Sequence, residues 1–139
     1  MQDAGAILVD SSVWIQFFRA GHSAEAEVLD GLLRAGPVAT CAPIRAEALS
    51  GARTSARFQQ LQTLFESLVD LGLPDDVWAQ VALQRFALAR RGHQASLVDL
   101  LVAVTAHAHH ANLWTLDEGL RRAATYLTVP LYQAAALQP

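Results

Sequence analysis

Apolar residues follow two different periods along this chain, and the change between them predicts where strands give way to helices. Residues 7–9 (ILV) form a short apolar run typical of a buried strand, and the run ends abruptly at Asp10. Beyond Asp10, the aromatic and aliphatic residues fall on one face of a helix expected from Trp14 to Ala20 and ended by Gly21. The segment is therefore predicted to be a strand that leads into a helix, with a carboxylate at the junction.

The same alternation continues along the chain. Further strands are expected over residues 38–42, 69–71, 112–116 and 128–132. The predicted helices run from Ser23 to Gly36-Pro37, from Pro43 to near Gly51, along the apolar stripe Phe58–Leu68, from Asp75 to Arg90-Arg91-Gly92, from Ser96 to Ala108, and through Leu120. The apolar residues of the helix that begins at Asp75 are Val77, Val81, Leu83 and Leu88. Alternating strands and helices indicate an α/β fold with a mainly parallel sheet, in a single domain over residues 1–139.

Composition narrows the class of protein. Hydrophobic residues make up 53% of the chain, which is enough for a core, yet no apolar run approaches the roughly 20 residues that span a bilayer. The N-terminus has no basic segment, so no signal peptide and no membrane contact are expected. Cys41 is the only cysteine, which excludes a disulfide within the chain and favours the reducing cytoplasm.

Charge excludes several chemistries. The net charge of −3 is not typical of a nucleic-acid binder, although the charge of a site can differ from that of the whole chain. The sequence contains no lysine, so all ten of its Lys and Arg residues are arginine. A Walker-A phosphate loop and a Schiff-base enzyme each need a lysine and are therefore excluded.

Acidic residues stand where the predicted elements meet. Asp10 and Asp117 each follow an apolar run (ILVD, LWTLD), so both carboxylates can lie at one edge of a parallel sheet. Each could equally be an ordinary N-cap of the next helix. Asp99 lies among apolar residues (LVDLLVAV), where it must be paired, capped or bound to a metal, and Ser96 stands at capping-box spacing before it. Glu47 alone is typical of a solvent-exposed acid.

Taken together, these four acids indicate a more specific chemistry. Carboxylates brought within a few ångströms repel one another unless a cation joins them. Ligand sets made only of oxygen favour Mg²⁺ or Mn²⁺. Such ions activate water and stabilise an in-line displacement at phosphorus. The pattern therefore predicts a metal-dependent phosphodiesterase.

Four segments, in this order, resemble the motifs of the PIN-domain ribonucleases, specifically the VapC-type toxins: ILVDSSVWIQFFR, RAEALSGAR, RRGHQASLVDLLVAVTA and LWTLDEGL. The resemblance implies an α/β/α sandwich with a mainly parallel sheet of four or five strands and Mg²⁺- or Mn²⁺-dependent RNA cleavage. It also implies a homodimer, and a VapB-type antitoxin that blocks the site in a heterotetramer or larger assembly.

The resemblance also assigns site residues. Its catalytic acids match Asp10, Glu47, Asp99 and Asp117, of which all but Glu47 are expected to bind the metal. Its hydroxyl residues, which orient the carboxylates, match Ser11, Ser12 and Thr115. The last motif departs from the family pattern, because Leu120 stands where an aromatic residue is usual and Glu118 adds a charge.

Two other functions stay open from the sequence. One is a PIN-like scaffold that binds RNA or protein without cutting. The other is a phosphoaspartate enzyme that uses Asp10, which is weaker because Ser12 stands where a second acid is needed and no lysine is available.

Other residues have candidate roles in binding. Arg45, Arg53, Arg57, Arg90 and Arg91 are candidates for RNA phosphate contacts, although ordinary surface positions are the simpler interpretation. The aromatic residues of the first helix are expected in a core or interface. With the second helix they would form a groove for an amphipathic segment of a partner, which would place an arginine or lysine among the acids.

Overall fold

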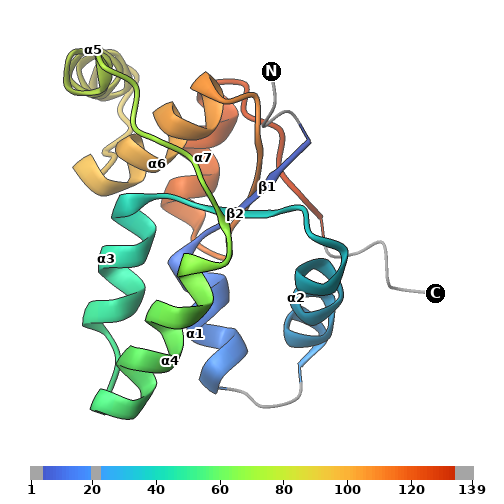
Figure 1. Cartoon of the computed structure of the whole chain (residues 1–139). Helices are drawn as coiled ribbons and strands as arrows, with labels where there is room; N and C mark the ends of the chain where they lie inside the picture. The colour runs from blue at the N-terminus through green and yellow to red at the C-terminus, as the bar shows by residue number, and fades with distance from the viewer. Residues whose placement is uncertain (1–4, 20–22, 134–139) are drawn as a thin grey trace.

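Four short parallel strands form the centre of the fold (Figure 1). The computed structural model describes residues 5–19 and 23–133. The sheet order is β3-β2-β1-β4. The strands are β1 (Ile7–Val9), β2 (Val38–Thr40), β3 (Val69–Asp70) and β4 (Asn112–Trp114). All pairings are parallel, as the alternating sequence pattern predicted.

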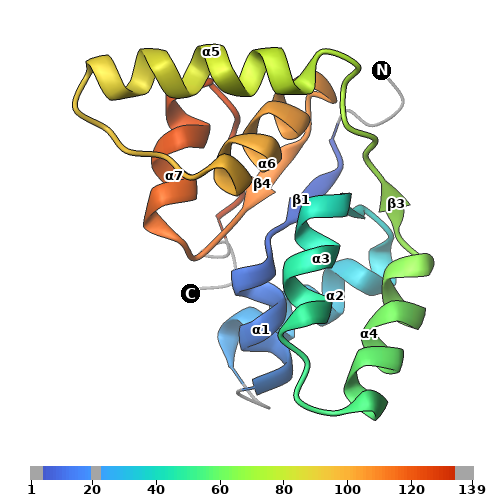
Figure 2. The same cartoon turned by 90° about the vertical axis from the view of Figure 1, so that its left-hand side faces the viewer.

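The sheet is flanked by helices in two groups (Figures 1 and 2). One group contains α1 (Ser11–Arg19), α2 (Ala24–Ala35), α3 (Ala42–Ser50) and α4 (Ser55–Glu66). The other contains α5 (Val77–Arg90), α6 (Leu97–Ala108) and α7 (Glu118–Tyr126). The two groups meet where α3 contacts α6. Within the described part of the chain, no helix is long and apolar enough to cross a membrane.

Local capping explains why several helices begin and end where the sequence predicted. The Ser23 hydroxyl accepts a hydrogen bond from the Ala26 amide (3.0 Å), and the Ser96 hydroxyl accepts one from the Asp99 amide (3.0 Å). Gly36 ends α2 in the left-handed conformation, with φ of 92°, which favours glycine. Helix α1 begins at Ser11, three residues before the predicted start, whereas its predicted end at Ala20 and Gly21 lies outside the described residues.

The core forms around β1 and α6. All three residues of β1 are buried, and Trp14 of α1 packs edge-on against Phe65 of α4 with ring centres 5.2 Å apart. The Trp14 indole N–H donates to the Val9 carbonyl (3.1 Å), so this large residue is buried without an unpaired donor. Residues 100–106 of α6 are all buried, in keeping with the apolar residues that surround Asp99 in the sequence.

Several predicted boundaries were wrong. Residues 128–132 do not form a strand: Leu131 makes only an isolated bridge to Leu113, and Thr128 has a left-handed φ of 59°. Within residues 5–19 and 23–133, the sheet therefore has four strands. Strands β2, β3 and β4 end one or two residues earlier than predicted, and α7 continues well beyond Leu120. Leu83 does not join the buried face of α5, because it is 57% exposed.

The strand order determines where on the sheet the candidate site lies. The chain runs from β1 outward through β2 to β3, then returns to place β4 on the other side of β1. In parallel α/β sheets, ligands bind outside the carboxyl ends of strands at such a reversal. Asp10 follows β1 and Thr115 follows β4, and the Asp10 amide donates to the Trp114 carbonyl (2.9 Å). The first and last predicted motifs therefore meet at this edge.

Candidate active site

Asp10 is a buried carboxylate fixed by two hydroxyl groups. It is only 4% exposed. Its Oδ2 atom accepts hydrogen bonds from the Ser12 hydroxyl (2.7 Å), the Thr115 hydroxyl (2.8 Å) and the Ser12 amide (3.3 Å). The hydroxyls of Ser12 and Thr115 therefore hold the Asp10 carboxylate in one orientation. These hydrogen bonds all fall on one oxygen, so Oδ1 forms no hydrogen bond to any described residue and stays open to a ligand.

The same two hydroxyls fix the segment that follows β4. The Thr115 hydroxyl accepts a hydrogen bond from the Asp117 amide (3.0 Å), and the Ser12 hydroxyl accepts one from the Leu116 amide (3.0 Å). Each hydroxyl therefore connects Asp10 to the backbone that carries Asp117. One hydrogen-bond network therefore holds both the Asp10 carboxylate and the backbone of Leu116 and Asp117.

Asp117 is the N-cap of α7, one of the two alternatives weighed from the sequence, and this does not exclude a place in the predicted site. Its Oδ2 atom accepts a hydrogen bond from the Leu120 amide (2.8 Å) at the start of α7. Leu120, which replaces the usual aromatic residue, is 1% exposed and anchors this turn in the core. Glu118 is exposed and lies 4.0 Å from Arg121.

Glu47 is held at the site by Ser11. The Ser11 hydroxyl donates to Glu47 Oε1 (3.0 Å), and Ser11 itself is buried. This bond joins α1 to α3, which also contacts α6. Glu47 is exposed, as the sequence suggested for a lone glutamate, yet its orientation is fixed by a side chain 36 positions away.

The pKa of Asp99 depends on its burial and on the charges of the other three acids. Burial raises the pKa of Asp99 above its ordinary value, and the negative charge of Asp117 is the next largest cause. Asp10 and Glu47 act in the same direction, whereas a hydrogen bond with Ser96 opposes them. The structure therefore brings all four predicted acids into one electrostatic cluster.

Gly119 keeps an open space between two of these carboxylates. A Cβ atom at this position would lie 3.3 Å from both Asp99 Oδ2 and Asp117 Oδ2. These oxygens thus converge on one small region, which a side chain would narrow. Sequence reasoning missed Gly119; the signal was a glycine two residues after a candidate acid, at the start of a helix.

The donor set fits a hard divalent cation that keeps much of its water. Among residues 5–19 and 23–133, no three His, Cys, Asp or Glu side chains lie close enough to form a complete metal site by themselves. Asp99 and Asp117 nevertheless converge, and Asp10 presents a free oxygen. Mg²⁺ is commonly bound by only one or two carboxylates, with water and substrate phosphate supplying the remaining ligands.

Comparison with known proteins identifies the class to which this fold and site belong. The family model described as the PIN domain matches residues 7–126, so the chain belongs to the PIN-domain family. A relative named Ribonuclease VapC11, from Mycobacterium tuberculosis, is 34% identical over 111 residues, covering 77% of this chain and 83% of the relative. The resemblance noted in the sequence is confirmed.

Solved structures share the fold. One, of FitAcB from Neisseria gonorrhoeae, has a TM-score of 0.70 and 22% identity, covering 94% of this chain and 99% of that one. Another, of VapBC2 from Rickettsia felis bound to a promoter DNA fragment, has a TM-score of 0.72 and 18% identity, covering 91% and 97%. The predicted α/β/α architecture is confirmed.

The raised pKa of Asp99 leads to a prediction about stability. The folded state binds this proton more readily than the unfolded chain, so metal-free protein should gain stability as pH falls through the raised pKa toward the ordinary value of 3.8. At pH 7 the ionised carboxylate is destabilising. Asp99→Asn should therefore raise Tm at pH 7 in EDTA and flatten its dependence on pH, as measured by differential scanning fluorimetry. A Tm several degrees below wild type at pH 7 would contradict this.

Proposed function

We propose that this chain is a metal-dependent endoribonuclease toxin. The observation that carries the proposal is the cluster of four carboxylates at the carboxyl ends of β1 and β4, fixed so that Asp10 offers an unused oxygen. Membership of the PIN-domain family and the ribonuclease named among its relatives support the same conclusion. We place its action in the cytoplasm. The buried Cys41, whose pKa burial raises to about 12, is consistent with a chain that uses no disulfide.

Each acid has a role in this proposal. Asp10, Asp99 and Asp117 would hold Mg²⁺ or Mn²⁺, which when bound supplies an activated water and offsets charge at the scissile phosphate. Ser12 and Thr115 keep Asp10 in place by donating to one oxygen only. Glu47, oriented by Ser11, has a second oxygen that can accept a hydrogen bond from water entering the site.

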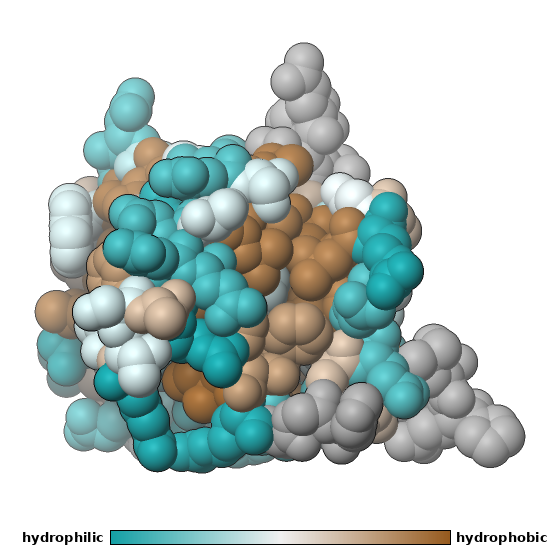
Figure 3. Space-filling view, turned by 60° about the horizontal axis from the view of Figure 1, so that its bottom comes forward, coloured by the Kyte–Doolittle hydropathy of each residue, from teal (hydrophilic) through white to brown (hydrophobic). Residues whose placement is uncertain are grey.

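We also propose a VapB-type antitoxin as the partner, in a heterotetramer or larger assembly. The VapBC2 complex named above supports this. Four carboxylates with little cationic compensation would attract an arginine or lysine from the partner. Phe17 and Phe18 of α1 and Leu32 and Leu33 of α2 are only partly buried, so they can receive an amphipathic segment. Figure 3 views the end of the molecule that carries α1 and shows hydrophobic surface bordered by hydrophilic residues.

The nuclease activity is tested by cleavage of bacterial RNA with purified protein, with Mg²⁺ or Mn²⁺ and with EDTA. We expect discrete fragments that require the metal. Asp10→Asn should reduce the rate at least about 100-fold, because several kcal/mol of charge stabilisation depend on the site. Glu27→Gln, an exposed acid on α2, is the matched control and should cleave normally.

Metal-dependent cleavage by Asp10→Asn at the wild-type rate would refute the proposed site. If wild type neither cleaves RNA nor gains thermal stability from Mn²⁺, the non-catalytic scaffold becomes the better account.

A homodimer through α5 is the proposed assembly of the toxin. Helix α5 lies along the outside of the molecule (Figure 2) and contains no acidic residue. Trp78, Leu83 and Phe86 on this helix are 61%, 57% and 58% exposed. Interface cores are enriched in aromatic residues and arginine and depleted of acids, and α5 follows this pattern, with Arg85 and Arg90 among its exposed residues.

The dimer prediction is that Phe86→Glu gives monomers at concentrations where wild type is dimeric, because a two-fold interface would bury two added charges. Analytical ultracentrifugation measures the change. Gln62→Glu, on the exposed surface of α4, is the control and should stay dimeric. A wild-type monomer at tens of micromolar would rule the interface out.

A further inference from the structure

We propose that the pocket between α1, α3 and α4 binds the phosphate backbone of the RNA strand beside the scissile bond, through Arg53, Arg57 and Arg19. The inference rests on the proposed function and extends it, because it assigns a substrate-binding surface outside the acid cluster. Of the ten arginines in the chain, only these three are assigned to RNA binding at this pocket.

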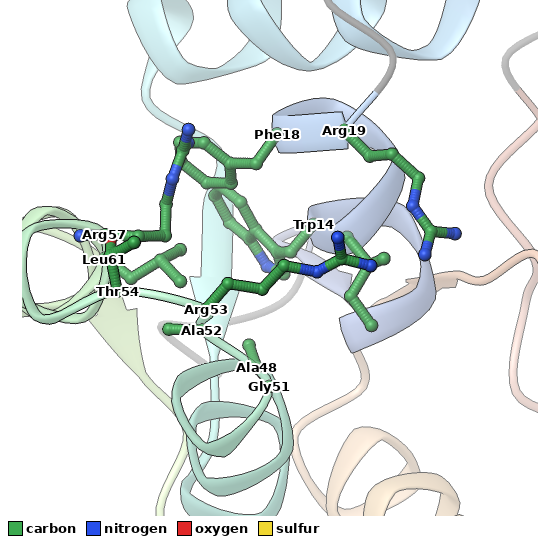
Figure 4. Close-up of a pocket in the computed structure, with 11 residues that line it drawn as sticks. Trp14, Phe18, Arg19, Ala48, Gly51, Ala52, Arg53, Thr54, Arg57 and Leu61 are labelled. Atoms are coloured by element: carbon green, nitrogen blue, oxygen red, sulfur yellow. Dashed lines mark hydrogen bonds between the residues drawn. The ribbon is translucent and has the colours of Figure 1, made fainter.

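The pocket combines cationic side chains with apolar walls. Its volume is about 510 Å³. Trp14, Ile15 and Phe18 line it from α1, and Leu61 lines it from α4. In Figure 4, Arg53 extends from the segment between α3 and α4 toward α1, and Arg57 lies beside Phe18. Arg19 stands at the far end of α1.

The pocket begins directly beside the acid cluster. Ala48, which lines it, follows Glu47 in the sequence, and Ile15 lies one helical turn beyond the Ser11 that bonds Glu47. A strand whose scissile phosphate reaches the acids therefore has its neighbouring phosphates within reach of this pocket. RNA is a polyanion that must approach four carboxylates, so cations at this edge are needed to offset the repulsion.

These arginines are not neutralised within the described chain. Arg57 places its guanidinium 4.7 Å from the centre of the Phe18 ring, and no carboxylate in residues 5–19 or 23–133 pairs with it. Toward the same described residues, Arg53 and Arg19 form neither an ion pair nor a hydrogen bond, and both are exposed. Three guanidinium groups without carboxylate partners at one pocket point to an anionic ligand.

Most of the other arginines contact an acid, a carbonyl or an aromatic ring, including three of the five that the sequence suggested. Arg45 pairs with Asp70, Arg90 lies over the Phe86 ring at 4.3 Å, and Arg91 lies over the Tyr126 ring at 5.1 Å. Further partners are Asp30 for Arg34, Glu118 for Arg121 and the Ala95 carbonyl for Arg85. The pocket brings together three arginines that no acid in the described part of the chain pairs with.

The chemistry favours RNA over an acidic peptide. A guanidinium group binds phosphate oxygens in a planar, two-pronged geometry. The Arg57 guanidinium group, which lies over the Phe18 ring, offers a planar surface on which an unpaired base can stack. Because the pocket adjoins the acid cluster, one RNA strand can place phosphates and a base at the pocket while its scissile phosphate reaches the acids.

The test is binding of a 5′-labelled single-stranded RNA to Asp10→Asn protein without added metal, by fluorescence anisotropy at several salt concentrations. Adding Arg53→Gln and Arg57→Gln together should weaken binding about tenfold or more at low salt. It should also lower the slope of log K against log [salt] by about 1.4, which is roughly 0.7 for each lost phosphate contact. Arg34→Gln, on the distant exposed pair with Asp30, is the control and should change neither.

Kinetics on otherwise wild-type protein separate this inference from the function it rests on. The double arginine variant should show a raised KM with little change in kcat, and the same thermal stabilisation by Mn²⁺ as wild type. Unchanged binding, slope and KM, while wild type still cleaves RNA, would overturn the pocket but not the nuclease. So would normal RNA binding combined with lost binding of an acidic peptide. If wild type does not cleave, reduced binding by the double arginine variant still supports the pocket.

Discussion

The buried carboxylate of Asp10, held by the hydroxyls of Ser12 and Thr115, is the contact on which the rest of the site depends. An ionised carboxylate that is 4% exposed is costly unless it is hydrogen-bonded, and here two hydroxyls and one amide satisfy a single oxygen. Because the two hydroxyls come from segments 103 positions apart, this contact also joins the end of β1 to the end of β4. It leaves the other oxygen free for a ligand.

The remaining acids follow from that junction. Thr115 fixes the Asp117 amide, Asp117 begins α7, and the space beside Gly119 separates Asp117 from Asp99. Burial and, after it, the negative charge of Asp117 raise the pKa of Asp99, so the ionised cluster is unfavourable without a cation. The arginine pocket at its edge supplies positive charge where a polyanion would enter, although the chain as a whole is acidic.

Local signals made much of this architecture predictable, and long-range contacts account for the rest. The caps at Ser23 and Ser96 and the acid at the end of β1 act within a few residues, so their sequence patterns were sufficient. The prediction of a strand over residues 128–132 failed because an apolar run does not reveal that Thr128 turns the chain and that only Leu131 reaches β4. The open space beside Gly119 and the pairing of Arg45 with Asp70 depend on distant residues, which no local pattern reports.

The central claim is that these acids form a cation site, and its most direct test is a crystal structure of protein soaked in Mn²⁺, with the ion located by anomalous scattering. The account predicts an anomalous peak beside Gly119, bounded by the carboxylates of Asp99 and Asp117 and facing the free oxygen of Asp10. The peak should be absent in Asp99→Asn crystals. The account would be contradicted if Mn²⁺ were found only at residues outside this acid cluster while protein from the dissolved crystals still cleaves RNA.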